Sequence, residues 1–334
     1  MTKNYYEQVI KRFMRRCCII YNEPLPGALE DELDVMDQVV HVEQGMRDLG
    51  IDVYRKGISE KFMDEINTLV LEKPDFVYNL VESINNKGEL NYFVPALLNL
   101  NCIAYAGNSH EAIFLTTSKV LASQMMKLAG IPNPACYFPS QMLLLEPGKR
   151  YILKPIWEDG SLGITADSVF DCKPGYEEKL KGLSDSHWFI EEFIDGREFN
   201  MSVFSGSNGP EVLPLAEIVF VGYDESRPKI IDYKAKWEFD TFEYDNTVRD
   251  FPGDKLDSDV TKKLRQVALD CWKLFGLRGY ARVDARVDCN NNVFVIEINA
   301  NPCIQPNGGF MAATRAGGYS FPEVLKRIID DLNT

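Results

Sequence analysis

The sequence predicts an α/β protein with more than one domain, on three observations. The N-terminal third alternates short apolar runs with segments of helical periodicity, which is typical of a parallel sheet covered by helices. Near the C-terminus, two runs of alternating residues flank an asparagine-rich turn, the pattern of an antiparallel β-hairpin. A length of 334 residues is too great for one ordinary hydrophobic core. We therefore expect α/β architecture, with α+β character in the C-terminal part.

The N-terminal region is predicted to be a β-α-β-α-β unit. Apolar residues recur at helical spacing over residues 34–49, and Gly50 follows as a helix stop signal. The chain carries neither a G-x-G-x-x-G after a strand nor a G-x-x-x-x-G-K-[ST] motif, so we expect no dinucleotide fingerprint and no phosphate loop of that type. The other elements of the unit are strands at 15–21, 51–54 and 75–80 and a helix at 61–72.

The middle of the chain contains two candidate phosphate contacts. Lys119 lies in the first turn of a helix predicted over residues 117–129. Lys154 lies in a predicted strand just before the glycine-containing loop at 158–163, whose backbone N–H groups can approach phosphate oxygens. Taken alone, each lysine is more often a solvated surface charge. Further predicted elements are a helix and a strand within 90–110, strands at 151–155, 187–194, 197–203 and 212–221, a charged, aromatic-rich loop at 229–250, and helices at 258–275 and 321–332.

The hairpin at residues 279–302 has its register set by the turn. Asn290 and Asn291 tolerate the left-handed conformation that a tight turn needs. A two-residue loop at these asparagines, or a looser loop over 289–292, gives the same register. Side chains alternate between the two faces of a strand, and one face is expected to be apolar. That face would carry Val283, Val287, Phe294, Ile296 and Ile298.

The opposite face of the hairpin carries four polar side chains. Asp284 is expected opposite Glu297, and Arg282 opposite Asn299. Two carboxylates that face each other across a strand pair repel and destabilise it. A bound divalent cation removes that repulsion, and carboxylate and amide oxygens suit magnesium. An exposed face with solvated charges would give the same pattern, so the hairpin alone leaves both interpretations open.

Composition limits the classes of partner. A formal net charge of −14 argues against general binding of nucleic acid or of anionic membranes. The eight cysteines show no paired metal-ligand spacing and no secretory signal is recognisable, so we expect reduced thiols in a cytoplasmic protein. The longest uncharged run, residues 90–110, is interrupted by proline, glycine and asparagine and is not expected to span a membrane.

Six segments from about residue 105 to the C-terminus form one ordered set of motifs. They are SKVLASQMMKLAGIPNP, YILKPIWEDGSLGI, FIEEFIDGREF, DYKAKW, GYARVDARVD and VIEINANP. In this order and spacing they resemble the ATP-grasp enzymes, and more narrowly the D-alanine–D-alanine ligase family. The resemblance implies an ATP-grasp fold of three α/β domains, at 1–107, 108–192 and 193–334, with ATP held between the central and C-terminal domains.

The resemblance also implies a nucleotide site. Lys119 and Lys154 match lysines that contact the phosphates of ATP, and Glu198 matches the carboxylate that binds the ribose. Lys236 lies in the segment that closes over the phosphates. The interdomain segment whose edge hydrogen-bonds adenine would consist of Glu191, Glu192, Phe193 and Ile194.

Catalytic and metal-binding residues follow from the same resemblance. Arg282 matches the arginine that stabilises the transition state, and Arg282, Lys236 and Ser161 form the expected catalytic set. The expected cofactors are ATP and Mg²⁺, with Mn²⁺ as an alternative. The implied metal ligands are Asp284, Glu297 and Asn299, in agreement with the register derived from the hairpin.

The implied reaction is the ATP-dependent ligation of a carboxylate to an amine. The carboxylate attacks the γ-phosphate of ATP to give an acyl phosphate, and the amine then displaces phosphate from the acyl carbon. Because an acyl phosphate hydrolyses in water, residues 229–250 are expected to form a lid. The alternatives are another acid–amine pair, or a non-catalytic ATP-binding module, which would not need the polar residues of the hairpin. Expected partners are small-molecule carboxylates and amines rather than nucleic acid or membrane, with a homodimer left open.

Several positions depart from the family's pattern. Its N-terminal Ser-x-Glu motif has no clear counterpart in residues 22–30, and Gly160 and Trp237 stand where the family has a serine and a tyrosine that hydrogen-bond with that glutamate. Gly308 replaces a serine that binds the acceptor carboxylate, and Cys303 replaces a glycine and is expected to line the pocket. Losing hydrogen-bonding groups changes the preference of a polar site. We therefore expect D-alanine to be a poor substrate or not the best one.

Overall fold

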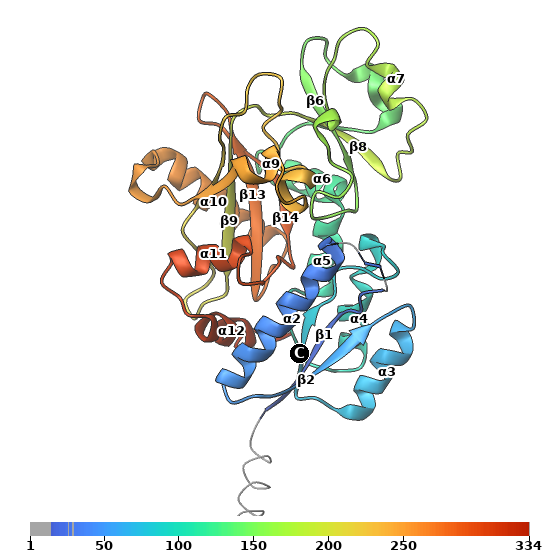
Figure 1. The fold of residues 1–334 in the computed structure, drawn as a ribbon, viewed down its shortest axis with the longest axis vertical. Helices are drawn as coiled ribbons and strands as arrows, with labels where there is room; N and C mark the ends of the chain where they lie inside the picture. The colour runs from blue at the N-terminus through green and yellow to red at the C-terminus, as the bar shows by residue number, and fades with distance from the viewer. Residues whose placement is uncertain (1–14, 26, 29, 334) are drawn as a thin grey trace, which may run out of the picture.

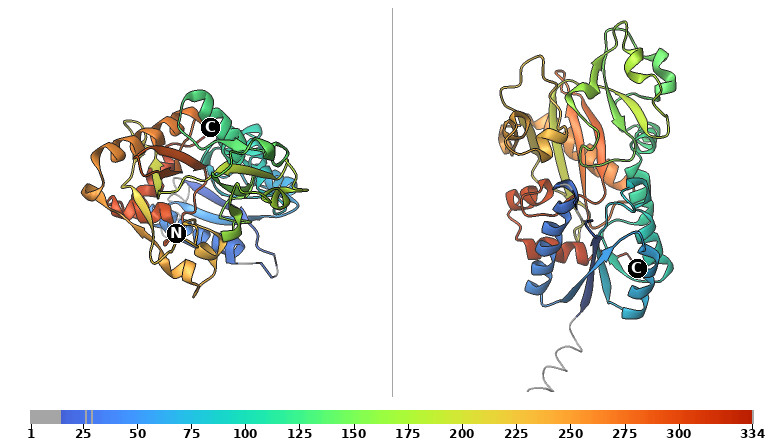
Figure 2. Two further views of the ribbon diagram at one scale, coloured as in Figure 1. Left: turned by 90° about the horizontal axis from the view of Figure 1, so that it is seen from above. Right: turned by 45° about the vertical axis from the view of Figure 1, so that its right-hand side comes forward.

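The computed structural model describes residues 15–25, 27–28 and 30–333. Within these residues the chain forms three β-sheets with helices packed on their faces (Figure 1). Figure 2 shows the N-terminal sheet towards one end of the long axis, and the small sheet that contains β6 (Arg150–Pro155) and β8 (Trp188–Glu192) at the other. The predicted α/β class is confirmed. None of the described helices combines the length and the apolar character needed to span a bilayer.

The predicted β-α-β-α-β order of the N-terminal unit is confirmed. Its elements are β1 (Arg16–Asn22), α2 (Glu30–Asp48), β2 (Asp52–Ile58), α3 (Phe62–Glu72), β3 (Phe76–Leu80), the 3₁₀ helix η1 (Gly88–Leu90), α4 (Phe93–Leu100) and β4 (Tyr105–Ala106). The strands are parallel in the order β2-β1-β3-β4. In β1, Ile19 belongs to the core that includes Val39 of α2, whereas Ile20 belongs to the core that includes Leu69 of α3. Burial on both faces explains why this strand reads as an unbroken apolar run.

Two helices connect this unit to the rest of the chain. They are α5 (His110–Thr117), which the sequence analysis did not separate from the preceding loop, and α6 (Lys119–Ala129). Although both lie within the range predicted for the central domain, Ala112 and Met126 share one core with Val283 and Val295 of the C-terminal hairpin. The three sheets follow the predicted domain ranges, while the cores extend across the boundaries. The division at residues 107 and 192 therefore stays a prediction.

The small sheet is antiparallel, with strand order β5-β8-β6-β7. Its strands β6 and β8 appear where apolar strands were predicted, and Tyr151 and Ile190 lie in the core beneath them. The remaining elements of this part are β5 (Cys136–Tyr137), η2 (Pro139–Leu144), η3 (Ala166–Ser168), β7 (Val169–Asp171) and α7 (Glu177–Leu180).

The C-terminal sheet is the largest of the three. Its elements are β9 (Arg197–Phe204), β10 (Glu211–Val212), β11 (Ala216–Phe220), β12 (Thr247–Asp250), η4 (Gly253–Lys255), α10 (Ser258–Leu274), β13 (Tyr280–Val287) and β14 (Val293–Asn299). The strands run in the order β12-β11-β9-β13-β14, with β10 beside β9. The apolar face of α10, with Val260 and Leu264, packs on this sheet. The chain closes with α11 (Gly309–Ala316) and α12 (Phe321–Ile329), and α12 packs against α2 of the N-terminal unit (Figure 1).

Residues 229–250 are not the plain loop that was predicted. They contain α8 (Tyr233–Trp237), α9 (Phe242–Asn246) and the edge strand β12. The Asp232 carboxylate accepts a hydrogen bond from the Ala235 N–H, and the Thr241 hydroxyl accepts one from the Tyr244 N–H. These two N-caps are the sequence signal for the short helices, and pairing with β11 fixes the strand.

The predicted hairpin register is confirmed for the four polar residues but not for the residues next to the turn. Asp284 pairs with Glu297 and Arg282 with Asn299, yet the register then shifts so that Ala285 pairs with Val295. The extra residue, Ile296, is a β-bulge that inverts the alternation of β14. The prediction that Phe294 and Ile296 face the core is therefore wrong; Val293 and Val295 are buried there instead. The turn also differs from both predictions, which were a loop at 290–291 or over 289–292. The Asp288 N–H donates to the Asn292 carbonyl oxygen, so the loop covers 289–291. Asn291 has the left-handed conformation expected of it, with φ 62°.

Candidate active site

A cavity of about 900 Å³ is lined by residues from all three sheets. This volume is within the range of small-molecule sites. Every residue predicted for catalysis, nucleotide binding or metal binding lines this one cavity. They are Lys119, Lys154, Ser161, Glu191, Glu192, Phe193, Ile194, Glu198, Lys236, Arg282, Asp284, Glu297 and Asn299. Their individual roles stay predictions.

Arg286 organises the residues predicted to bind adenine and ribose. Its guanidinium donates to Glu198 Oε2 at 2.6 Å and to the Ile194 carbonyl oxygen at 3.1 Å, and it lies over the Phe193 ring, 5.0 Å from the centroid. Glu198 and Arg286 are both buried, so each must have its charge compensated inside the protein. Burial raises the pKa of Glu198, and the charge of Arg286 opposes that rise. The sequence analysis missed Arg286, although the alternation of β13 places it on the predicted polar face.

Lys154 forms an ion pair with Glu191 across β6 and β8. The Glu191 side chain is only 6 % exposed, so Lys154 is the cation that compensates its buried charge. The lysine therefore lies directly beside the predicted adenine-binding segment, on the small sheet.

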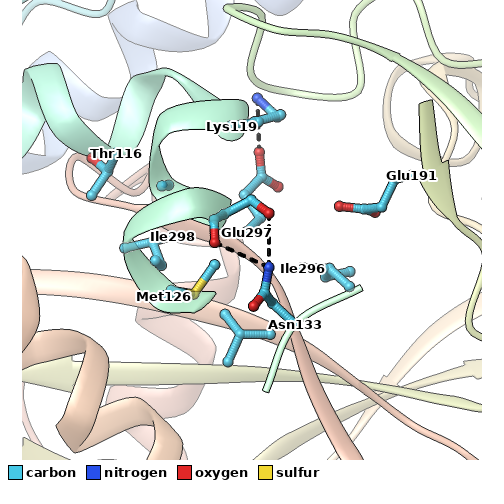
Figure 3. A pocket seen from close by; sticks show the side chains of 11 residues that line it. Thr116, Lys119, Met126, Asn133, Glu191, Ile296, Glu297 and Ile298 are labelled. Carbon is cyan, nitrogen blue, oxygen red and sulfur yellow. Dashed lines mark hydrogen bonds and ion pairs between the residues drawn. The ribbon is translucent and has the colours of Figure 1, made fainter. Parts of the chain in front are cut away.

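Lys119 connects the glycine-containing loop to the hairpin. Its ammonium donates to the Glu158 carbonyl oxygen at 2.6 Å and lies 3.0 Å from Asp159 Oδ1 and 3.2 Å from Glu297 Oε1. Figure 3 shows Lys119 joined to Glu297, with Glu191 on the other side of the pocket. Burial raises the pKa of Glu297, but nearby cations, Lys119 first among them, outweigh burial and hold that pKa below its usual range. Asp159 was not predicted as a site residue.

The Asp284 carboxylate is surrounded by donors. Arg282 donates to it through Nε and Nη2, each at 2.8 Å, and Asn200 of β9 donates through Nδ2 at 2.8 Å. Asn299 Oδ1 accepts from the Asn301 N–H at 2.9 Å. Asn200 was missed because it reaches Asp284 from a strand 84 residues away in the chain.

The oxygens of Asp284, Glu297 and Asn299 are of the type that magnesium prefers. In this conformation Arg282 and Lys119 neutralise the two carboxylates. Across the described part of the chain, no group of three or more His, Cys, Asp or Glu side chains is arranged to hold a metal. A set of two carboxylates and one amide suits magnesium only together with further oxygens, such as those of nucleotide phosphates.

The segment predicted as a lid contacts the glycine-containing loop through two side chains. Trp237 Nε1 donates to the Gly160 carbonyl oxygen at 2.9 Å, and the Ser161 hydroxyl donates to the Ile231 carbonyl oxygen at 2.7 Å. Both contacts are side-chain to backbone hydrogen bonds, at positions where the resemblance implied hydrogen bonds between side chains. The ammonium of Lys236 lies over the Trp237 ring, 5.0 Å from its centroid.

A second group of acidic residues lines the N-terminal side of the cavity. Asp34 Oδ2 accepts from the Cys303 thiol at 3.1 Å and from Gln38 Nε2 at 3.3 Å, and the same amide nitrogen lies 3.3 Å from Glu82 Oε1. Desolvation raises the pKa values of Asp34 and Glu82. Cys303 lines the cavity as predicted. In the loop at 22–30, Pro26, Leu29 and the Glu30 side chain lie outside the described residues, as do residues 1–14 of the predicted N-terminal domain.

Comparison with known proteins identifies the family. A family model described as the D-ala D-ala ligase C-terminus matches residues 151–330, more than half of the chain. The chain belongs to the D-alanine–D-alanine ligase family. The D-alanine–D-alanine ligase of Carboxydothermus hydrogenoformans is 29 % identical over 275 residues, covering 78 % of this chain and 82 % of that protein. The uncharacterized protein y4sG of Sinorhizobium fredii is 26 % identical over 259 residues, covering 76 % and 73 %.

Solved structures of family members have the same fold. The D-alanine–D-alanine ligase from Bacillus anthracis complexed with ATP superposes with a TM-score of 0.72 at 20 % identity, covering 95 % of this chain and 96 % of that one. The VanG D-Ala:D-Ser ligase from Enterococcus faecalis gives 0.71 at 17 % identity, covering 95 % and 99 %. These neighbours confirm the predicted ATP-grasp fold. As a member of this family, the chain is an ATP-dependent ligase that forms carbon–nitrogen bonds.

Proposed function

We propose that the protein joins the carboxylate of one small molecule to the amine of another through an acyl-phosphate intermediate, releasing ADP and phosphate. One observation supports this most: six motifs that are far apart in the sequence each contribute residues to the same cavity. The residues predicted to bind the nucleotide, those of the hairpin and those of the predicted lid all line it. The lid segment also contacts the glycine-containing loop, which would keep water from an acyl phosphate.

The residue roles proposed for the nucleotide follow this arrangement. Lys119 and Lys154 would contact phosphate oxygens, the segment at 191–194 would hydrogen-bond adenine, and Glu198 would bind the ribose. Arg286 would hold Glu198 and the adenine segment in place through the bonds described above. The nucleotide would then lie between the small sheet and the C-terminal sheet, in keeping with the proposed domains at 108–192 and 193–334.

The chemical step requires stabilisation of charge on the transferring phosphoryl group and on the tetrahedral intermediate. Arg282 is held in place by the hydrogen bonds that its Nε and Nη2 donate to Asp284, and Lys236, in the predicted lid, lines the cavity. Fixed donors of this kind contribute roughly a few kcal/mol each to transition-state stabilisation. Magnesium held by Asp284, Glu297 and Asn299 would neutralise phosphate charge. Ser161 would act by tying the lid to the glycine-containing loop.

Hydrogen exchange of the lid tests the proposed closure. We expect the backbone amides of residues 229–250 to exchange faster without nucleotide than with Mg-ATP. A phosphate contact at Lys236 would stabilise the closed position of the segment, so the short helices α8 and α9 would open less often. Mass spectrometry of deuterated peptides measures this difference. The α10 peptides serve as an internal control, since that helix is packed in the core. Equal exchange across 229–250 with and without Mg-ATP would rule out a nucleotide-dependent lid.

A substrate screen tests the proposed activity and the expectation about D-alanine. ADP release is followed with pairs of amino and hydroxy acids, and the products are identified by mass spectrometry. We expect a ligation product from at least one pair, and lower kcat/KM for D-alanine with itself than for the best pair, since the hydrogen-bonding groups at positions 160 and 308 are lost. D-alanyl-D-alanine as the best product would contradict the second expectation. No product from any pair would contradict the ligase itself.

A further inference from the structure

Asp284 lies in the middle of the polar face of the C-terminal sheet. Its strand β13 runs between β9 and β14 (Figure 1). The register places Asp284 opposite Glu297 on one side and opposite Asn200 on the other. Asp284 and Asn200 are only 5 % and 7 % exposed, and both line the cavity. The proposed metal ligand therefore has a buried amide neighbour that is fixed in a central strand of the same sheet.

The donors around Asp284 fill the acceptor sites of its carboxylate. An ionised carboxylate offers about four lone-pair sites on its two oxygens. Arg282 Nε lies 2.8 Å from Oδ1 and 3.1 Å from Oδ2, and Arg282 Nη2 lies 2.8 Å from Oδ2. Asn200 Nδ2 adds a further contact, 2.8 Å from Oδ1. A metal ion bound to either oxygen must therefore replace at least one of these contacts.

The two oxygens of Asp284 differ in the residues that hold them. Among the described residues, Oδ2 accepts from Arg282 alone, whereas Oδ1 is shared by Arg282 and Asn200. A guanidinium is attracted to a phosphate that enters the cavity, so its bonds to Oδ2 can be exchanged. The Asn200 amide carries no charge and follows no phosphate. Oδ2 is therefore the oxygen that Arg282 can give up, and Oδ1 is the oxygen that stays held.

We propose that Asn200 is a positioning residue for metal binding: its amide fixes Asp284 Oδ1 while Arg282 yields Oδ2 to the metal ion. This inference rests on the proposed function and extends the metal-binding set by a residue that does not touch the metal. Groups that orient a metal ligand in this way contribute about 10- to 100-fold to metal affinity. Arg282 keeps its Nε bond to Oδ1, and its Nη2 becomes free to donate to the transferring phosphoryl group.

Two variants that lack the amide donor test this assignment. Asn200→Leu keeps the volume of the side chain and Asn200→Ala removes it, so a packing role would separate them. The affinity for Mn²⁺, used as the probe of the metal site, is measured by electron paramagnetic resonance with a non-hydrolysable ATP analogue present. We expect both variants to bind Mn²⁺ about 10- to 100-fold more weakly than the wild type. Their affinity for the analogue in EDTA should be unchanged.

Excess metal distinguishes positioning from a structural defect. With a substrate pair that gives a product, both variants should turn over slowly at a Mg²⁺ concentration that saturates the wild type. Raising Mg²⁺ by about the factor lost in affinity should restore kcat, because the variants keep every group proposed to act in the reaction. The matched control is Met201→Ala on the same strand. Met201 lies in the core, so this variant loses packing beside Asn200, keeps the bond to Asp284, and should keep wild-type Mn²⁺ affinity.

The outcomes separate this assignment from the ligase itself. The assignment of Asn200 is overturned, while the ligase stands, if both Asn200 variants bind Mn²⁺ like the wild type, if Met201→Ala is impaired as much as they are, or if excess Mg²⁺ does not restore kcat. If the wild type binds no Mn²⁺ with the analogue, the proposed metal site is overturned as well. If Mn²⁺ affinity shifts as expected but no substrate pair yields a product, the ligase is contradicted and the assignment stands.

Discussion

Replacing Glu297 with glutamine is expected to lower turnover roughly 10³-fold. The substitution keeps the shape of the side chain and removes one of two charges on the proposed metal-binding face. A metal that neutralises phosphate charge contributes several kcal/mol to transition-state stabilisation. Losing one fixed contact to the transition state costs a similar amount. The fold should persist, because Lys119 keeps Asp159 and the Glu158 carbonyl oxygen as partners.

Two measurements separate this effect from misfolding. Isothermal titration with Mg-ATP should show weaker binding of the variant, and circular dichroism should show an unchanged spectrum. Glu178→Gln is the control, since the Glu178 side chain is 77 % exposed and lies on α7 away from the cavity. If Glu297→Gln turned over at the wild-type rate, the proposal that the hairpin binds the metal would be wrong.

Replacing Arg286 with methionine is expected to destabilise the fold by about 3–5 kcal/mol, because it leaves the Glu198 charge buried without a partner. Thermal or urea unfolding measures this loss. The double variant Arg286→Met with Glu198→Gln should recover much of it, since removing both charges also removes their desolvation penalty. The exposed pair of Lys326 and Asp330 on α12 provides the comparison: Lys326→Met should cost at most about 1 kcal/mol.

The pH dependence of the Arg286 variant has a defined sign. Burial already raises the pKa of Glu198 in the folded protein, and losing Arg286 removes the charge that opposes this rise. The unfolded chain has a glutamate pKa of about 4.3, so above that value the folded variant binds more protons than the unfolded one. The stability deficit relative to wild type should therefore shrink as the pH falls from about 8 to 6. A deficit that is constant over this range would show that Glu198 does not carry it.

The sequence by itself determined the local parts of this protein. Period-two alternation in the hairpin placed Asp284 opposite Glu297, and the apolar runs gave the strands of the N-terminal sheet. These features depend on neighbours along the chain, so periodicity and turn residues report them. Ordered motifs gave the family and the residues that line the cavity. The sequence did not reveal the true length of the turn or the bulge at Ile296. Each shifts the register by one residue, and the two shifts cancel, so Asp284 still pairs with Glu297 as predicted.

Only the tertiary structure decided which charged and polar side chains contact one another. Glu198 and Arg286 are 88 residues apart in the chain, and Asp34 and Cys303 are 269 apart. No periodicity connects such pairs; they meet because sheets and helices from distant segments pack around one cavity. The same packing places the Arg249 guanidinium of β12 against Gly309, the first residue of α11. Which charges compensate one another is a property of the whole set of neighbours, and so it becomes visible only when the chain is folded.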